Sequence, residues 1–505
     1  MVARKTVIDE FVHNFPKDGK LISDIQNDIS IDFVSFKKKV ISVYSYFSAI
    51  RHAKEDKAIL FLDNSIDYIA VLIAFFDIDI VSVPLNTQLN KTKAVYLIGY
   101  SQARFIITSK EVLSRNQWLK KLDCRIILTH EIFQSAVESG ETPHVTSKCL
   151  AREKDLKFIM YTSGTVGSPK GVMLSRESVK LKILSLINLL NFKPGAHFFS
   201  FLPFFSGHGM IPGMLVPFLS GCRMYIARFD PFLAFRFWTL VKKHRINYFT
   251  SVPSILALLK DQIGDIRKQD LQYIQAIFSA SSQLPQPVYD WYSSYLGIHV
   301  SNCYGLTETA SWVSINLNAG KEEKADCIGR VFGADIGVFD KKGKRLKYNQ
   351  IGEFRLRSPW NMLGYFKNHK ATKSCITAGG FLKTGDTGYI DASGKIFILG
   401  RIKHIIIKNG INVYPLEIDQ VFLGHPDIKS SISFGVPDGN YGEKIITALM
   451  VNDAAKSKDK YFKYAMENLP HFLMPSDIFF PADLPKGPVG KIAVDIIREQ
   501  YIKEG

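Results

Sequence analysis

Short apolar runs alternate with longer amphipathic stretches between the N-terminus and Gly329. The runs KAILFLDN, IVSVPLN and ARFIITS are rich in isoleucine, valine and phenylalanine, and the helical stretch IDYIAVLIAFFD lies between the first two. INYFTSV and IQAIFSAS continue the style further along the chain. Apolar strands separated by amphipathic helices are typical of βα units, so this part is predicted to form mostly parallel sheets flanked by helices.

The pattern changes after Gly329 to closely spaced strands and turns, as in IGEFRLRS and GYIDASGKIFILGR, which predicts β-hairpins. The stretch KHIIIKNGINVYPLEIDQVFLGHP then reads as strand, loop and helix. We therefore predict an α/β protein with two domains. The large N-terminal domain, residues 1–400, has parallel sheets flanked by helices and a β-rich subdomain, and residues 401–505 form a small α+β domain.

Composition narrows the class of protein. The chain has 505 residues, 46% of them hydrophobic and 22% charged, which excludes a disordered or fibrous chain. Its 64 basic and 47 acidic residues give a formal charge of +17. Such a charge favours anionic partners, such as nucleotides, coenzyme A, acidic proteins, nucleic acid or anionic lipid, although a lysine-rich solvated surface would explain it equally well.

Cysteine spacing and the apolar segments bear on the compartment. The six cysteines lie far apart without a CxxC pair, which indicates neither a zinc site nor a disulfide framework. Residues 194–222 contain no Asp, Glu, Lys or Arg, yet four prolines would break a membrane-spanning helix there. The N-terminal MVARKTVIDEFVHNF lacks the apolar core of a secretory signal. We expect a cytoplasmic protein without a membrane span.

A glycine-rich stretch, YTSGTVGSPKGVMLS at 161–175, follows the strand-like LKFIMYTS and precedes a helical stretch. Glycines let backbone N–H groups approach phosphate oxygens, and hydroxyls and a lysine add donors. The candidate phosphate-binding residues are Thr162, Ser163, Gly164, Thr165, Gly167 and Lys170. Pro169 before the lysine and Gly171 after it rule out the P-loop pattern. Alone, this loop is weak evidence for phosphate.

Four later stretches add to this evidence for a phosphate site. YGLTE at 304–308 combines an aromatic ring, a hydroxyl and the carboxylate of Glu308, as needed to stack a base and to hold Mg²⁺ beside phosphates. KTGDTGYID at 383–391 places Asp386 in a predicted tight turn, where it could bind the hydroxyls of a ribose. Lysines and arginines follow in GRIKHIIIKNG and PKGPVGKI. Taken singly, a turn-capping aspartate, a surface glutamate and solvated lysines remain the simpler interpretations.

In this order and spacing, the motifs resemble the superfamily of ATP-dependent adenylating enzymes, from about Ile59 to Lys491. It comprises acyl- and aryl-CoA ligases, peptide-synthetase adenylation domains and firefly-type luciferases. The resemblance implies that the glycine-rich loop holds the β- and γ-phosphates of ATP. It further implies that Tyr304 stacks on adenine, Thr307 contacts the α-phosphate, Glu308 binds Mg²⁺, and Asp386 with Arg401 holds the ribose.

The resemblance also implies a two-step reaction. Lys491 would bridge the substrate carboxylate and the α-phosphate while the acyl-adenylate forms and pyrophosphate leaves. The small domain would then rotate about Lys403, so that a pantetheine thiol attacks the acyl group and expels AMP. The implied partners are a small carboxylic acid, ATP, and CoA or an acidic carrier protein, with no nucleic acid.

Departures from the family pattern limit what the resemblance implies. Ser206 stands where many CoA ligases have a histidine, with His208 two residues on; His404 stands where an acidic residue often follows the hinge, and Val166 replaces a threonine. The segment 194–222 lacks the aspartate that pairs with an α-ammonium group, which disfavours amino-acid substrates.

The small-residue stretch IFSASSQLP at 277–285 leaves room for a ligand. Its possible neighbours are Phe204, Phe205, Met210, Trp312 and Val313, so the acid is predicted to be apolar or aromatic, although these side chains could equally belong to the core. The leading hypothesis is an acid:CoA ligase, and the runner-up is a stand-alone adenylation enzyme that loads a carrier protein. The sequence also leaves open a luciferase-like oxygenase and a non-catalytic binding protein.

Overall fold

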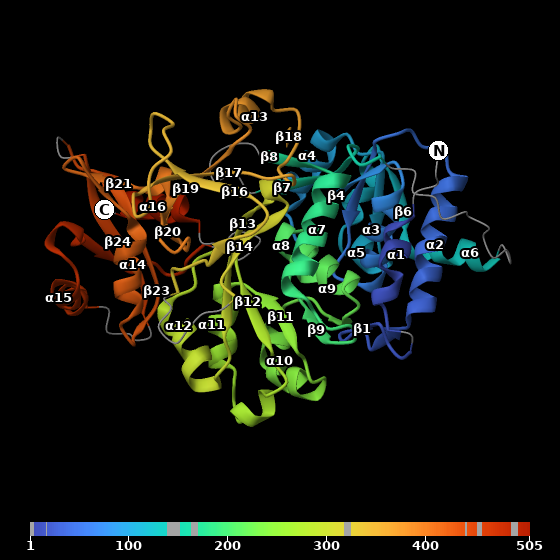
Figure 1. Cartoon of the computed structure of the whole chain (residues 1–505), viewed down its shortest axis with the longest axis horizontal. Coiled ribbons are helices and arrows are strands. Elements are labelled where there is room, and N and C mark those ends of the chain that lie inside the picture. The colour runs from blue at the N-terminus through green and yellow to red at the C-terminus, as the bar shows by residue number, and fades with distance from the viewer. Residues whose placement is uncertain are drawn as a thin grey trace.

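The computed structural model describes residues 5–16, 18–138, 152–162, 170–317, 325–439, 442–451, 457–485 and 493–504. Within these ranges the chain is an α/β protein with two large, mostly parallel sheets, which confirms the predicted fold class (Figure 1). A four-stranded antiparallel sheet and a smaller C-terminal unit follow along the chain.

The first large sheet has seven described strands. In spatial order they are β18 (Gly364–Tyr365), β8 (Lys170–Ser175), β7 (Leu156–Thr162), β4 (Ile80–Pro84), β3 (Asp56–Phe61), β5 (Phe105–Thr108) and β6 (Arg125–Leu128). The strands from β7 to β6 pair in parallel, whereas β8 is antiparallel to both of its neighbours. The runs KAILFLDN, IVSVPLN and ARFIITS are thus strands, as predicted.

The second large sheet has nine described strands. They are β15 (Arg330–Val331), β14 (Ser311–Ile315), β13 (Val300–Leu306), β12 (Ala276–Ser279), β11 (Tyr248–Ser251), β9 (His197–Ser200), β10 (Arg223–Ile226), β1 (Ile22–Asp24) and β2 (Ile29–Ile31). The strands from β13 to β1 pair in parallel. Because the carboxyl ends of parallel strands share one edge, residues that follow β11, β12 and β13 lie together.

Helices flank these sheets (Figure 1). In the large unit they are α1 (Val7–Phe11), α2 (Phe33–Ala49), α3 (Ile66–Asp77), α4 (Lys91–Ser101), α5 (Lys110–Arg115), α6 (Thr129–Glu138), α7 (Arg176–Leu190), α8 (Gly207–Met210), α9 (Val216–Leu219), α10 (Pro231–Lys243), α11 (Pro253–Asp261), α12 (Gln286–Asp290) and α13 (His369–Cys375). The Ser65 hydroxyl caps α3 by accepting from the Tyr68 N–H, and almost every side chain of this helix is buried. A helix that is apolar on all sides must lie between layers, which is where α3 packs.

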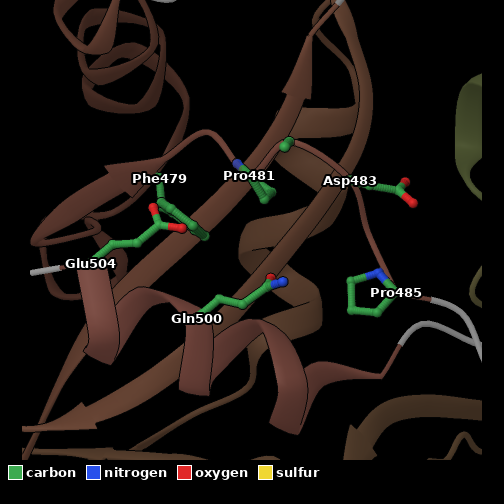
Figure 2. A pocket seen from close by; sticks show the side chains of 7 residues that line it. Phe479, Pro481, Asp483, Pro485, Gln500 and Glu504 are labelled. Carbon is green, nitrogen blue, oxygen red and sulfur yellow. The ribbon is translucent and has the colours of Figure 1, made fainter.

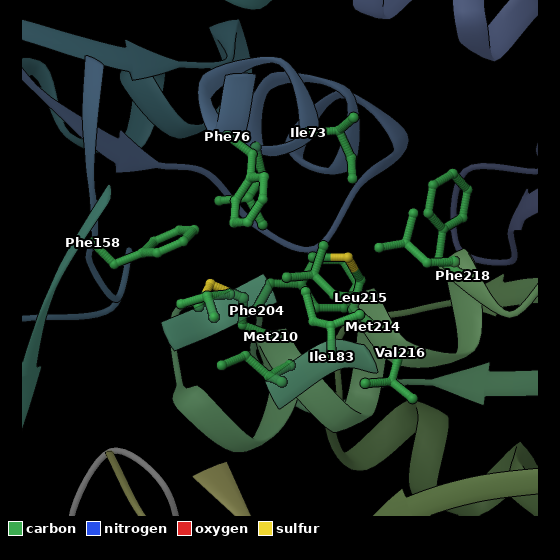
Figure 3. Close-up of a cluster of buried hydrophobic side chains, with 14 of the residues drawn as sticks. Ile73, Phe76, Phe158, Ile183, Phe204, Met210, Met214, Leu215, Val216 and Phe218 are labelled. Atoms are coloured by element: carbon green, nitrogen blue, oxygen red, sulfur yellow. The ribbon is translucent and has the colours of Figure 1, made fainter. Parts of the chain in front are cut away.

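The main core joins α3 and α7 to the charge-free segment 194–222 (Figure 3). That segment forms α8, a π-helical turn η3 (Ile211–Leu215) and α9, with Pro212 and Pro217 near the starts of the last two. Its residues from Gly209 to Cys222 are buried. The charge-free segment is therefore a run of short helical turns in the core, interrupted by prolines. Within the described ranges, no helix combines the length and apolar character that a membrane crossing needs.

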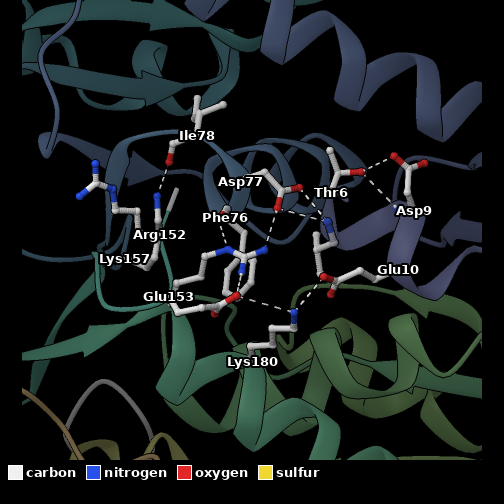
Figure 4. Close-up of polar contacts among 12 residues, drawn as sticks. Thr6, Asp9, Glu10, Phe76, Asp77, Ile78, Arg152, Glu153, Lys157 and Lys180 are labelled. Carbon is white, nitrogen blue, oxygen red and sulfur yellow. Dashed lines mark hydrogen bonds and ion pairs between the residues drawn. The ribbon is translucent and has the colours of Figure 1, made fainter. Parts of the chain in front are cut away.

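A charged network anchors the N-terminus to the end of α3 (Figure 4). The buried carboxylate of Asp77 accepts from the Val7 N–H at 3.0 Å and from the Tyr44 hydroxyl at 2.9 Å, and it pairs with Arg176 at 3.3 Å. Arg176 also donates to the carbonyl of Phe76, and Lys157 donates to that of Ile78. These cations satisfy carbonyl groups that the last turn of a helix leaves without partners.

The remainder is β-rich. An antiparallel sheet contains β16 (Asp335–Phe339), β17 (Gly352–Arg357), β19 (Leu382–Ile390) and β20 (Ile396–Arg401). After Arg401 come β21 (Ile406–Lys408), β22 (Ile411–Val413), α14 (Pro415–Leu423), β23 (Ile428–Pro437), β24 (Glu443–Val451), α15 (Lys458–Asn468), β25 (Asp477–Phe479) and α16 (Val494–Glu504). Two apolar clusters of this segment contain only residues from Ile406 onward. The domain boundary at residues 400 and 401 stays a prediction.

Candidate functional site

The YGLTE stretch forms the turn between β13 and β14. Tyr304 and Gly305 lie near the end of β13, which finishes at Leu306, and Thr307 and Glu308 lie in the short helix η6 (Thr307–Thr309). A side chain at Gly305 would stand 2.1 Å from the carbonyl oxygen of Ser311, so only glycine permits this close pairing. The tight connection holds Tyr304, in β13, and Glu308, in η6, only four residues apart in the chain.

Asp386 lies within hydrogen-bonding distance of two other predicted site residues. Its Oδ2 accepts from the Tyr304 hydroxyl at 2.7 Å, and its Oδ1 pairs with Nε of Arg401 at 2.7 Å. The residue is 4% exposed, and the hydroxyl of Thr384 accepts from its N–H. Burial, followed by the nearby Asp386, raises the pKa of Tyr304 well above its usual value, so its hydroxyl is a donor at neutral pH. Three predicted site residues thus form one cluster.

The predicted tight turn at Asp386 is wrong. Asp386 lies in the strand β19, opposite Arg401 of β20. Gly385 has φ +71°, the pairing of β19 with β17 shifts register between Lys383 and Thr387, and its pairing with β20 shifts between Thr387 and Gly388. The two glycines of KTGDTG therefore accommodate an irregularity within a strand rather than a chain reversal.

The described ends of the glycine-rich stretch lie on two antiparallel strands, β7 and β8. Thr162 ends β7 and pairs with Lys170, which begins β8. Ser163, Gly164, Thr165 and Gly167, with Val166, lie outside the described residues. The expected helix does not follow the loop directly, because GVMLS continues as β8 against β7 and α7 begins only at Arg176.

Lys170 and Glu308 share a contact that the sequence did not indicate. The hydroxyl of Tyr365 donates to Oε1 of Glu308 at 2.8 Å, and Nζ of Lys170 lies 5.0 Å from the centroid of the Tyr365 ring. Tyr365 is 57 residues from Glu308 in the chain, so no local spacing signals the pair. The strand β18 brings it into place by pairing with β8.

The hinge candidate Lys403 lies in a short helix, η7 (Ile402–His404), directly after β20. Its Nζ is 3.7 Å from Oδ2 of Asp495 in α16. Burial, together with Lys403, lowers the pKa of His404 to about 4, so this histidine is neutral at physiological pH. Lys491 lies outside the described residues.

His208, in the segment LPFFSGHG, faces small polar side chains. Its Nδ1 is 3.0 Å from the hydroxyl of Ser281, in the stretch IFSASSQLP, and its Nε2 is 2.6 Å from the hydroxyl of Thr250. Its ring packs against Trp312, with centroids 5.4 Å apart. The hydroxyl of Thr307 lies 3.9 Å from the position that a side chain at Gly207 would take, so this segment adjoins η6.

The apolar residues predicted beside this segment are mostly inside the core. Phe204 and Met210 belong to the cluster shown in Figure 3. Trp312 and Val313 belong to the same cluster and are at most 2% exposed. Phe205, Ser206, His208 and Ser281 are partly exposed. The accessible surface here is consequently more polar than expected.

A pocket of about 240 Å³ lies elsewhere, in the C-terminal unit (Figure 2). Its lining includes Phe479 and Pro481 from the region of β25, and Gln500 and Glu504 from α16. Its described lining contains no residue of the candidate site. Among the described residues, no group of three or more histidine, cysteine, aspartate or glutamate side chains is arranged to hold a metal ion.

Comparison with known proteins adds three findings. A family model described as "AMP-binding enzyme" matches residues 8–366. An oxalate–CoA ligase of Arabidopsis thaliana is 26% identical over 461 residues, 89% of either chain, and a long-chain-fatty-acid–CoA ligase, FadD13, of Mycobacterium tuberculosis is 27% identical over 461 residues, 90% of either chain. The crystal structure of ATP-bound MatB from Rhodopseudomonas palustris superimposes with a TM-score of 0.88 at 24% identity, covering 98% of both chains.

Proposed function

Because the chain belongs to the AMP-binding enzyme family, we propose that it is an ATP-dependent carboxylic acid:CoA ligase that works through an acyl-adenylate. The family assignment confirms the resemblance identified in the sequence, and the activity class of an adenylate-forming acid–thiol ligase follows from the family and from the CoA-ligase relatives. The acid, the acceptor and the roles of individual residues are the parts that we propose.

The observation that carries this proposal is the convergence of two clusters on one turn. Tyr304 joins Asp386 and Arg401 at one end of YGLTE, and Glu308 joins Tyr365 and Lys170 at the other. A nucleotide requires both kinds of group: an aromatic ring with an acid for the nucleoside, and cations with a metal-binding carboxylate for the phosphates. In this arrangement Asp386 and Arg401 would bind the ribose, and Lys170 would bind the departing pyrophosphate.

Magnesium fits the residues present. The carboxylate of Glu308 accepts one hydrogen bond through Oε1, and a carboxylate offers about four lone-pair sites, so capacity for a cation remains. Mg²⁺ characteristically takes one or two protein carboxylates and completes its shell with phosphate and water, so a larger cluster of acids is not required. Glu308 would hold the ion, which supplies positive charge to the phosphates.

In the first half-reaction, an oxygen of the acid's carboxylate attacks the α-phosphorus of ATP and pyrophosphate leaves. Negative charge builds at the α-phosphate, where Thr307 would donate a hydrogen bond and Lys491 would contribute a positive charge. In the second, a thiolate attacks the acyl carbon and AMP leaves with the bonding electron pair. The lysine would be withdrawn by rotation about Lys403.

For the acid, we favour a molecule with a second polar or anionic group. The partly exposed side chains beside η6 include Ser206, His208 and Ser281. The hydroxyl groups of Ser281 and Thr250 contact both ring nitrogens of His208, so it is the polar character of this lining, rather than a vacant histidine nitrogen, that supports a polar end group. The relatives' names do not decide the polarity of the acid. The oxalate–CoA ligase and the long-chain-fatty-acid–CoA ligase act on chemically opposite acids, yet they are almost equally identical to this chain. The apolar or aromatic acid predicted from the sequence stays the alternative, supported by Phe205.

The test is release of pyrophosphate from ATP with a panel of acids, with and without Mg²⁺. Short dicarboxylates and sulfonated acids form one arm, and medium-chain fatty acids and benzoates form the other. Formation of ADP and orthophosphate would contradict adenylation. Adding CoA or a carrier protein to the active acid tests the acceptor, and acylation of the carrier alone would establish the runner-up. A cytoplasmic location, where ATP and CoA are available, remains part of this proposal.

A further inference from the structure

Tyr365 contacts both the cation and the carboxylate of the phosphate side of the site. Its hydroxyl donates to Oε1 of Glu308 at 2.8 Å, and the face of its ring lies 5.0 Å from Nζ of Lys170. The side chain thus contacts both Lys170, the first residue of β8, and Glu308, on the YGLTE turn. Those two elements belong to different sheets.

The backbone around Tyr365 is fixed independently of any ligand. Its N–H donates to the hydroxyl of Thr372 at 2.8 Å, and the N–H of Phe366 donates to the carbonyl of Gly171 at 2.7 Å. Gly364 has φ +141°, and a side chain there would stand 2.8 Å from the Thr372 methyl group. The ring is 7% exposed. Its orientation is therefore set before a nucleotide binds.

We propose that Tyr365 is a positioning residue that couples Lys170 to the metal-binding carboxylate of Glu308. The proposal rests on the proposed function, since it assigns Glu308 to Mg²⁺. The hydroxyl restrains one oxygen of the carboxylate, so its remaining lone pairs meet the cation without a loss of side-chain freedom at the moment of binding. The ring face holds the ammonium group of Lys170 by a cation–π contact.

The two contacts belong to different parts of one side chain and can be removed separately. Tyr365→Phe removes the hydroxyl and keeps the ring, whereas Tyr365→Leu removes both. ATP affinity is measured by calorimetry without acid or acceptor, at zero and at saturating Mg²⁺. Tyr389→Phe is the matched control, because it removes a tyrosine hydroxyl from β19, where the ring stacks on Phe397.

Mg²⁺ should raise the ATP affinity of Tyr365→Phe about tenfold less than it raises that of the wild type. Without Mg²⁺, the variant and the wild type should bind ATP equally well. Tyr365→Leu should also weaken metal-free binding, and Tyr389→Phe should change neither value. The proposal is wrong if Mg²⁺ raises the ATP affinity of Tyr365→Phe as much as that of the wild type. It is also wrong if the variant loses the same ATP affinity with and without Mg²⁺. If Tyr365→Leu fails to fold, the phenylalanine variant still decides. An acid panel without pyrophosphate release would reject the proposed function while leaving this metal coupling measurable.

Discussion

Replacing Asp386 by alanine tests the nucleoside side of the site. Alanine removes the carboxylate that the Tyr304 hydroxyl and the Arg401 guanidinium both contact at 2.7 Å. It also removes the proposed acceptor for the ribose hydroxyls. A hydrogen bond to a charged group contributes about 1.5–3 kcal/mol, so ATP affinity should fall roughly 10- to 100-fold.

The same substitution carries a second, separable cost. The hydroxyl of Tyr304 is buried, and leaving such a group without a partner costs about 1–3 kcal/mol of stability. The contact to Arg401 adds little, because that side chain is 44% exposed and solvent replaces the carboxylate. Tyr304→Phe removes the internal hydrogen bond but keeps Asp386. It should therefore lower the unfolding midpoint while leaving ATP affinity within about threefold.

Calorimetric titration of ATP and thermal unfolding, followed for both variants, separate the two effects. Asp391→Ala is the control, because it also removes a carboxylate, but from the turn between β19 and β20. There Asp391 accepts hydrogen bonds from the backbone N–H groups of Ser393 and Lys395. Its ATP affinity should match the wild type. A folded Asp386→Ala protein with unchanged affinity would remove Asp386 from the nucleotide site and refute this reasoning.

Three further predictions address the reaction, the substrate and pH. Lys491→Ala should lose acid-dependent pyrophosphate release yet convert a supplied acyl-adenylate to thioester, whereas Lys403→Pro should make adenylate and stall afterwards. Single-turnover assays of each half-reaction check these outcomes. Equal loss of both half-reactions in Lys491→Ala would contradict the assignment of Lys491 to adenylation. His208→Leu should lower kcat/KM for dicarboxylates at least tenfold relative to hexanoate, and an unchanged ratio would return preference to the apolar acid. Burial raises the pKa of Asp419 to about 7, so the stability from its protonated form is complete below about pH 4 and is lost as pH rises through about 7. Asp419→Asn should accordingly raise the unfolding midpoint at about pH 9 and change it little at about pH 4.

The sequence correctly predicted the strands and helices whose formation depends on neighbouring residues. The run KAILFLDN became β3, and IDYIAVLIAFFD became α3 at Ile66–Asp77, because side-chain periodicity and the Ser65 cap are properties of adjacent residues. The glycines around Asp386 suggested a turn, yet pairing with β17 and β20, some of it more than 30 residues away in the chain, holds a strand there.

The candidate site divides in the same way. Tyr304, Asp386 and Arg401 were predicted through motifs, and the structure places them in contact. Tyr365 was missed, because its partner Glu308 is brought near by the pairing of β18 with β8 rather than by any spacing in the sequence. The polar surroundings of His208 likewise depend on Thr250, 42 residues away, and on Ser281, 73 residues away.

The buried pair of Asp77 and Arg176 has a consequence for synthesis of the chain. The two residues are separated by 99 positions, so a ribosome that releases the N-terminus first exposes α3 and its acid long before the matching guanidinium emerges. An isolated carboxylate is costly to bury, so the nascent segment around α3 keeps Asp77 hydrated until then. The contacts of Asp77 with Val7 and Arg176, which join α1, α3 and α7, can therefore form only after Arg176 has been translated.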